Sequence, residues 1–460
     1  MARRVRAGAR SSTSEVRRRL ARVVDGATPA LLVVVLLALL IPVATGSVIG
    51  AAAALGLAVL LVVLVTVGIE LTATALLLVA MTMAPMNDVK PVAAISFVTM
   101  SDVFFFLGVG LLLPILMTRG FHRQAPFLIG VAGVFVVGLV SSAVSTDPAA
   151  SLNGLVRLAV GALLLPIVFM LWRPGRRVLV AFAGAYVLGT AISVAKGRIS
   201  GVTSTDGRYA GLTEHPNILG VTCMLAVTLV PFLLVGTPRS YRWVVLGAGA
   251  VCGYGVWISG SRAALVGTAA VAVLYLVLSR RIEHAVVFFG ISIIPVYVVG
   301  RTFASGVVDG SPLGRLRGGG SASMSDLERQ DLARVAIGKF FSHPIIGTGF
   351  GDASLAHNIY LQIAAAGGVV GLAFYLLILL STVRQPLVLG SPAHLLALPA
   401  MAYVLIGPLT PLLWDRYVWC VLALPFLMSG QAREGRAAPE RDDGPAAVPP
   451  RRLTGRALRR

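Results

Sequence analysis

Long apolar runs, separated by short polar connections, make up most of the chain. A helix needs about 20 apolar residues to cross the hydrocarbon core of a bilayer. The runs before residue 90 are the shortest, and Glu70 stands between two of them, so twelve or thirteen spans also fit. The pattern predicts an all-α, polytopic membrane bundle of about 12–14 spans. The predicted spans lie near 29–45, 47–68, 71–86, 96–117, 126–143, 155–172, 178–195, 217–236, 243–258, 263–279, 285–300, 357–382, 392–412 and 416–430.

The composition agrees with a membrane protein. Of 460 residues, 57% are hydrophobic and 13% are charged, which leaves too little polar surface for a soluble protein of this length. The net charge of +20 also raises the alternative of nucleic-acid binding. We exclude that class, because the basic residues lie in short connections between spans and in the two tails. This is the distribution that the positive-inside rule describes.

The same rule orients the chain and divides it into five parts. Residues 1–28 form a basic cytoplasmic tail held near anionic lipid, and 29–300 hold the first group of spans. Residues 301–356 form a large extracytoplasmic loop, and 357–430 hold the last spans. Residues 431–460 are rich in Arg, Pro, Ala and Gly, and we expect a disordered cytoplasmic tail.

The second half of the large loop has the pattern of a helix. Ser325 to Glu328 reads Ser-x-x-Glu, a capping-box signature that predicts a helix start. Apolar residues follow at roughly helical spacing, and Pro344 ends the pattern. We expect a helix of about four turns on the membrane surface, which either packs over a site or only shields the loop.

The stretch from His343 to Gly371 concentrates unusual residues at the end of this loop. A glycine-rich turn runs from Pro344 to Gly351 and contains Gly347 and Gly349. Glycine there permits positive φ or a close approach to other groups. His357 and Asn358 follow, immediately before an apolar helix that we expect Gly367, Gly368 and Gly371 to break. An imidazole where a polar loop meets a membrane helix suits proton transfer; the alternative is that the His-Asn pair only caps the helix.

Two upstream stretches place arginines at the predicted outer ends of spans. One reads RYAGLTEHPN from Arg208 to Asn217, and the other is Ser261-Arg262-Ala263. A guanidinium near the hydrocarbon edge is costly without a partner. Two converging guanidinium forks would bind a pyrophosphate well; snorkelling to lipid head groups is the alternative. His215, before Pro216, is either a second acid/base group or a residue that shapes the turn.

The three stretches, in their order along the chain (Arg208–Asn217, Ser261–Ala263 and His343–Gly371), resemble the O-antigen ligase and O-antigen polymerase superfamily of membrane glycosyltransferases. The resemblance implies a GT-C-type fold and a metal-independent, inverting glycosyltransferase without a cofactor. It further implies a glycan donor linked to undecaprenyl pyrophosphate and an acceptor hydroxyl on a glycan, a lipid or a protein. The reaction would take place on the outer face of the inner or plasma membrane, in cell-surface polysaccharide synthesis. The resemblance does not separate ligase from polymerase.

The resemblance also assigns roles. It implies that His357 is the general base and that Arg208 and Arg262 bind the pyrophosphate. Arg329 matches a further family arginine by its spacing, although Ala333 replaces the tryptophan that commonly follows. The supporting residues would be His215, Asn217, Asn358, Gly347 and Gly349.

Other features change this picture little. The outward-facing residues show no metal-ligand spacing, and the three cysteines fit apolar packing. Asp415 and Arg416 suggest a structural ion pair in the last outer loop. A transporter or flippase of the same lipid-linked glycan is the alternative function. Such a protein tends to place charges in the middle of its spans, and this chain has almost none there.

Overall fold

The computed structural model describes residues 48–91, 98–119, 124–204, 207–279, 283, 286, 314–315, 322–351 and 356–428. The two predicted tails, the predicted span 29–45 and nearly all of the span 285–300 lie outside these residues, as does most of the first half of the large loop. The regular structure that is described is helical, apart from one isolated bridge between Thr203 and Tyr209.

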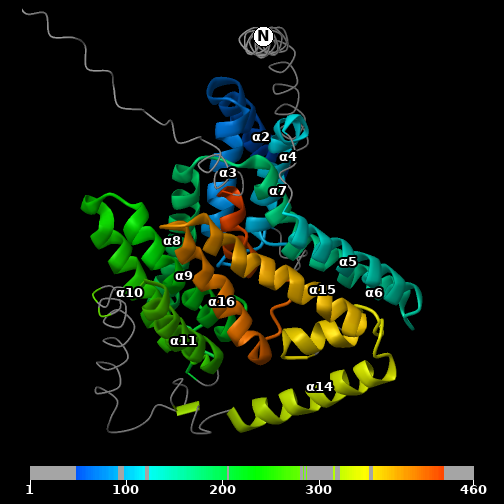
Figure 1. Ribbon diagram of the computed structural model, residues 1–460. Helices are drawn as coiled ribbons and strands as arrows, with labels where there is room; N and C mark the ends of the chain where they lie inside the picture. The colour runs from blue at the N-terminus through cyan, green and yellow to red at the C-terminus, as the bar shows by residue number, and fades with distance from the viewer. Residues whose placement is uncertain are drawn as a thin grey trace, which may run out of the picture.

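The helices follow the predicted spans closely (Figure 1). Within the described residues, six helical segments are long and apolar enough to cross a membrane, and four shorter apolar helices accompany them. The prediction of an all-α, multi-pass membrane protein is therefore confirmed. The bounds are α2 Val48–Val67, α3 Ile69–Met83, α4 Met100–Thr118, α5 Ala125–Ala143, α6 Pro148–Leu158, α7 Leu164–Trp172, α8 Arg176–Ser200, α9 Pro216–Gly236, α10 Arg242–Ile258, α11 Arg262–Ser279, α14 Ala322–Ser342, α15 Ile359–Leu389, α16 Ala397–Ile406 and α17 Arg416–Leu422.

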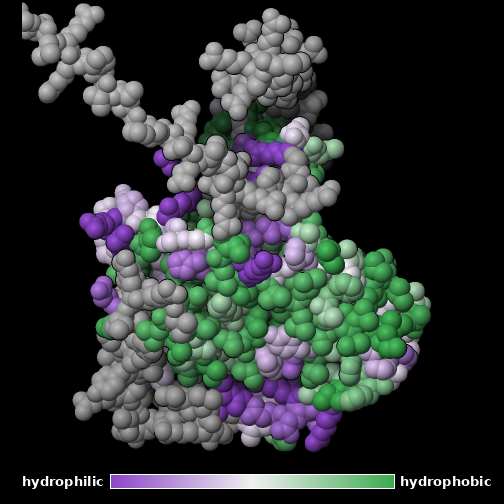
Figure 2. All heavy atoms as spheres, viewed as in Figure 1, coloured by the Kyte–Doolittle hydropathy of each residue, from purple (hydrophilic) through white to green (hydrophobic). Residues whose placement is uncertain are grey.

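The outer surface of the helical body is apolar, as a bilayer requires. Figure 2 shows hydrophobic residues across the middle of the molecule and a hydrophilic edge along α14. Large apolar side chains such as Leu139 and Leu188 are more than half exposed on spanning helices. Hydrocarbon tails would cover them, so their exposure is explained by the membrane.

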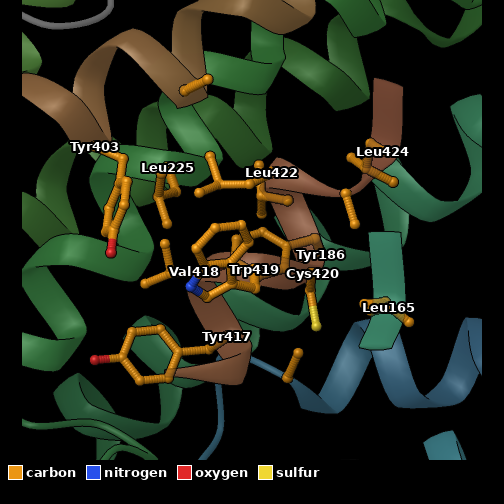
Figure 3. Close-up of a cluster of buried hydrophobic side chains, with 14 of the residues drawn as sticks. Leu165, Tyr186, Leu225, Tyr403, Tyr417, Val418, Trp419, Cys420, Leu422 and Leu424 are labelled. Carbon is orange, nitrogen blue, oxygen red and sulfur yellow. The ribbon is translucent and has the colours of Figure 1, made fainter. Parts of the chain in front are cut away.

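The short helix α17 forms the centre of the core. Val418, Trp419 and Cys420 have no exposed surface, and helices α7, α9 and α16 pack around them. Figure 3 shows the Trp419 ring among Leu225, Tyr186 and neighbouring side chains. The indole nitrogen of Trp419 donates to the carbonyl of Leu413, 3.1 Å away, which satisfies its polar atom inside the core. This packing fixes the loop before α17, which reaches the site described below.

The structure corrects one sequence-based expectation and gives the position of a helix break. The loop helix α14 exists, but it begins at Ala322, so the Ser-x-x-Glu pattern at Ser325 lies inside the helix and does not start it. Helix α15 is broken at Gly368, whose φ of 64° and ψ of −165° are not helical. The first part of α15 therefore carries the end of the large loop into the bundle, and the second part leaves in a new direction (Figure 1).

Candidate functional site

The glycine-rich turn is fitted into the break of α15. The amides of Thr348 and Gly349 donate to the carbonyls of Ala365 and Ala366 at 2.9 and 3.0 Å. Beyond the break, the amide of Val369 donates to the carbonyl of Pro344 at 2.8 Å. A helix break leaves buried backbone groups without helical partners, and unpaired groups are costly in an apolar environment. The turn supplies these partners, so the two segments form one structural unit.

Glycine is required at two positions of this turn by the backbone itself. Gly347 and Gly349 have φ of 75° and 98°, in the left-handed region that other L-residues avoid. A Cβ on Gly347 would collide with the backbone of Ala366, and one on Gly349 would lie 2.5 Å from the hydroxyl of Ser151. The turn is therefore held tightly against α15 on one side and α6 on the other.

His357 and Asn358 have separate tasks at the start of α15. Asn358 is the N-cap: its side-chain oxygen accepts from the amides of Tyr360 and Leu361 at 2.9 and 3.1 Å. The cap thus uses Asn358 and leaves the imidazole of His357 available. The His357 side chain is half-buried and lines a cavity.

His215 and Arg208 are connected through Asn217, to which both form hydrogen bonds. His215 is the N-cap of α9, and its Nδ1 accepts from the amide of Asn217 at 3.1 Å. The guanidinium of Arg208 donates to the side-chain oxygen of Asn217 and, at 2.8 Å, to the carbonyl of Ser259. Arg208 is buried, with 5% of its surface exposed, and it is not among the residues that line the cavity. It therefore supports the wall of the cavity that Asn217 and His215 form.

The cavity collects residues from distant parts of the chain. Its volume is about 260 Å³, and its wall comes from the starts of α9 and α11, from α14, from the residue before Asn358 and from the loop before α17. The predicted residues that line it are His215, Asn217, Arg262, Arg329 and His357. The structure thus brings five of the predicted site residues together. The others, Arg208, Asn358, Gly347 and Gly349, hold the segments that form the wall.

Three arginines line this cavity. Arg262 begins α11 and makes a two-point ion pair with Asp326 of α14, with one nitrogen–oxygen distance of 2.8 Å. Arg329 lies on α14 one turn farther along, and its buried Nε has no hydrogen-bond partner among the described residues. Arg315, which the sequence analysis did not select, is buried and also lines the cavity. Their combined positive charge suits a ligand with several negative oxygens.

The arginines also influence both histidines. Partial burial lowers the pKa of His357, and the positive charge of Arg329 lowers it further. Burial likewise lowers the pKa of His215, with Arg208 and Arg315 as the next causes. Both imidazoles are therefore neutral at neutral pH. A neutral imidazole can accept a proton, as a general base must.

The loop before α17 adds polar groups that sequence reasoning missed as site residues. Thr410, Asp415 and Tyr417 line the cavity, and the buried hydroxyl of Tyr417 has no hydrogen-bond partner among the described residues. Burial raises the pKa of Asp415 to about 7, although the positive charge of Arg157 opposes this. The guanidinium of Arg157 also lies over the ring of Trp414, 5.3 Å from its centroid.

Arg416 does not pair with Asp415, its predicted partner. It forms an ion pair with Asp102 of α4 instead. Because Asp102 also caps its own helix together with Thr99, this pair joins α17 to the start of α4. Asp415 therefore lines the cavity without Arg416 as its partner. Its position at the end of the last predicted outer loop is the one sequence signal that could have marked it as a site residue.

Among the described residues, no three His, Cys, Asp or Glu side chains come together as metal ligands do. The charged groups that the described part of the cavity offers to a ligand are mainly guanidinium groups, which bind phosphate oxygens without a metal ion.

Comparison with known proteins agrees with this geometry. Residues 247–376 match the model of the O-antigen ligase family (Wzy_C). This confirms the family resemblance that the motifs predicted. The matched O-antigen ligase segment runs from α10 into α15 and contains Arg262, Arg315, Arg329 and His357. A search of curated proteins gave no match.

The chain is thus a multi-pass membrane protein in which one segment matches the O-antigen ligase domain. The match to the O-antigen ligase model implies glycosyltransferase activity. His215 and Asp415 lie outside the matched segment, one before it and one after it, and yet both line the same cavity. The candidate site therefore needs parts of the bundle on either side of the O-antigen ligase domain.

Proposed function

We propose that this protein transfers or polymerises glycan from an undecaprenyl-pyrophosphate-linked donor onto an acceptor hydroxyl at the extracytoplasmic face of the membrane. One observation carries the proposal: a single cavity combines a neutral imidazole, His357, with three arginines. This combination fits a reaction that removes a proton from one partner and stabilises a diphosphate leaving group on the other.

The arginines are the donor end of the site. Arg262, Arg315 and Arg329 offer planar forks of N–H donors, which match the oxygens of a diphosphate. Arg208 acts indirectly, because its hydrogen bonds to Asn217 and to the carbonyl of Ser259 hold the start of α9 in place. Its positive charge still adds to the potential that favours an anion in the cavity.

His357 is the general base in this proposal. The imidazole takes the proton from the acceptor hydroxyl, and the oxygen attacks the anomeric carbon of the donor sugar. The bond between that carbon and the phosphate oxygen breaks, and undecaprenyl pyrophosphate leaves with its negative charge held by the arginines. A single displacement of this kind inverts the configuration at the anomeric carbon, and no metal ion takes part.

The acceptor is a hydroxyl of a glycan, a lipid or a protein. The polar groups of Thr410, Asp415 and Tyr417 line the cavity and can accept or donate hydrogen bonds to such an acceptor or to the donor sugar. The alternative, transport of the same lipid-linked glycan, does not require a neutral imidazole inside the arginine cluster. Enzymatic transfer therefore explains more of the site.

The test is a transfer assay with purified protein and lipid-linked glycan. A general base contributes about 10²- to 10⁴-fold to the rate, so His357→Ala and His357→Gln should both lower transfer by about that factor. Donor binding should persist, because the arginines remain. Glutamine keeps the hydrogen-bonding ability of the side chain and loses only its titration. Near-parental transfer by the glutamine variant would remove His357 as the base.

A further inference from the structure

The ion pair between Arg262 and Asp326 joins the cavity to the loop helix. Both terminal nitrogens of the guanidinium donate to both oxygens of the carboxylate, the arrangement in which arginine also binds a phosphate. The Arg262 side chain is 19% exposed and lines the cavity, whereas the Asp326 side chain is 43% exposed and does not line it. The hydrogen bonds from Arg262 lower the pKa of Asp326, which keeps its carboxylate charged.

Asp326 belongs to a helix that is attached to the bundle at few points. Among the described elements, α14 packs chiefly on α15, where Ala336 contacts the apolar side chains Ala356, Leu361 and Ala365. These contacts lie in the second half of α14. In the first half, Met324 and Leu327 are more than half exposed. The ion pair with Arg262 is therefore the main described attachment of the start of α14, from Ala322 to Asp326, to the spanning helices (Figure 1).

We propose that Asp326 and a donor phosphate compete for the same face of Arg262, and that exchange of one for the other releases the first turn of α14 from Arg262, while Arg329, farther along the helix, stays at the cavity. This inference rests on the proposed function, because it assigns the competing ligand to the diphosphate of the donor. The start of α14 therefore acts as a latch. The ion pair of Asp326 with Arg262 holds it closed, and binding of the donor phosphate to Arg262 opens it.

The physical reason is that one guanidinium fork cannot serve two anions. A phosphate that takes both terminal nitrogens of Arg262 leaves the Asp326 carboxylate without its partner and next to a like charge. Like charges at close range repel, and the repulsion is strongest where water is partly excluded. The carboxylate is then more stable when it turns to solvent, and the first turn of α14 moves with it.

The test compares binding of farnesyl diphosphate to the detergent-solubilised full chain and to two variants. Asp326→Asn removes the competing charge and should tighten the Kd by about two- to fivefold, the upper part of the range for a partly exposed ion pair. Asp331→Asn is the matched control, since it removes an equal charge from an exposed residue of the same helix whose ion-pair partner is Arg334. It should change the Kd by less than about twofold.

A second measurement follows the helix itself. Ser323 is exposed in the first turn of α14, and a nitroxide attached to a cysteine there reports local mobility. In the parent protein the label should become more mobile when farnesyl diphosphate is added and should not respond to farnesol, which has no phosphate. In the Asp326→Asn protein the label should be mobile before any addition. The native cysteines are buried and should not interfere.

The outcomes separate this inference from the proposed function. If the parent and Asp326→Asn proteins bind the diphosphate equally, or if the variant binds it more weakly, Asp326 is no competitor and only positions Arg262. An unchanged label in the parent protein would overturn the opening of α14. If no form of the protein binds farnesyl diphosphate, the proposed donor site itself is wrong, and the latch falls with it.

Discussion

The amide of Gly349 donates a hydrogen bond of 3.0 Å to the carbonyl of Ala366, two residues before the break of α15 at Gly368. This bond ties the glycine-rich turn to the helix that begins directly after His357. The orientation of His357 therefore depends on a turn whose backbone only glycine adopts easily.

Alanine at Gly347 should destabilise the protein. The left-handed backbone costs an alanine about 1–2 kcal/mol, and its Cβ would also collide with the backbone of Ala366. The free energy of unfolding should fall by at least about 2 kcal/mol, seen as a lower Tm of the purified protein. Gly338 of α14 is the control, because it is helical and a Cβ there meets nothing within 4 Å. Gly338→Ala should leave the Tm unchanged or raise it slightly, and a Tm for Gly347→Ala equal to that of the control would contradict the account.

The fall of kcat/KM at low pH, the acid limb of the pH profile, should reflect the protonation of His357. A base must be deprotonated to act, and partial burial and Arg329 lower the pKa of His357. The lowered pKa keeps the imidazole neutral to lower pH, so kcat/KM should stay high until the pH falls below the ordinary histidine value of about 6.5. Arg329→Met removes one positive charge, so it should move this limb to higher pH. Transfer measured between pH 4.5 and 8 with both proteins tests the shift.

Asp415 is the necessary control for that profile. Its pKa is raised to about 7, so its own titration would give a limb at higher pH than that of His357. Asp415→Asn removes this titration and should leave the limb below pH 6.5 in place. If the limb disappears in the asparagine variant, the titration seen in kcat/KM belongs to Asp415, and His357 is not the group that it reports.

Donor affinity should depend on the fork of Arg262 as well as on its charge. Hydrogen bonds to charged groups are worth about 1.5–3 kcal/mol, so Arg262→Ala should weaken the Kd for farnesyl diphosphate by about 10- to 150-fold. Arg262→Lys should recover only part of this, because an ammonium group lacks the planar fork. Arg334→Ala is the matched control: Arg334 pairs with Asp331 on the exposed side of α14. Equal Kd values for Arg262→Ala and Arg334→Ala would place the donor site elsewhere.

The sequence predicted the helices well because apolar runs of membrane-spanning length have few other uses. The helix predicted at 217–236 is observed at Pro216–Gly236. The start of α14 was missed by three residues, because the Ser-x-x-Glu pattern is local and a helix can continue through it. The glycines at 367, 368 and 371 were recognised as a break, but only the fitted turn selects Gly368 as the residue with positive φ.

The candidate site was predictable only where residues stand in a motif. His357 and Arg262 have neighbours in the sequence that mark them, and both line the cavity. Arg315 and Tyr417 have no such neighbours and reach the cavity through the packing of the bundle. Arg208 shows the opposite case, because the motif marks it although it lies behind the wall, bonded to Asn217.

The orientation of the bundle gives the last prediction. The arginine distribution predicts that α14 lies on the extracytoplasmic side and that the connection between α7 and α8 lies on the cytoplasmic side. Gln330 of α14 and Gly175 of that connection are both exposed, so a cysteine at either position can react with a thiol reagent. In intact cells, a reagent that does not cross membranes should label Gln330→Cys and leave Gly175→Cys unlabelled until the membrane is opened. The three native cysteines are buried, so the parent protein should give a low background. Labelling of Gly175→Cys in intact cells would reverse the bundle. The cavity that His357, Arg262 and Arg329 line would then face the cytoplasm, where an outer-leaflet donor could not reach it.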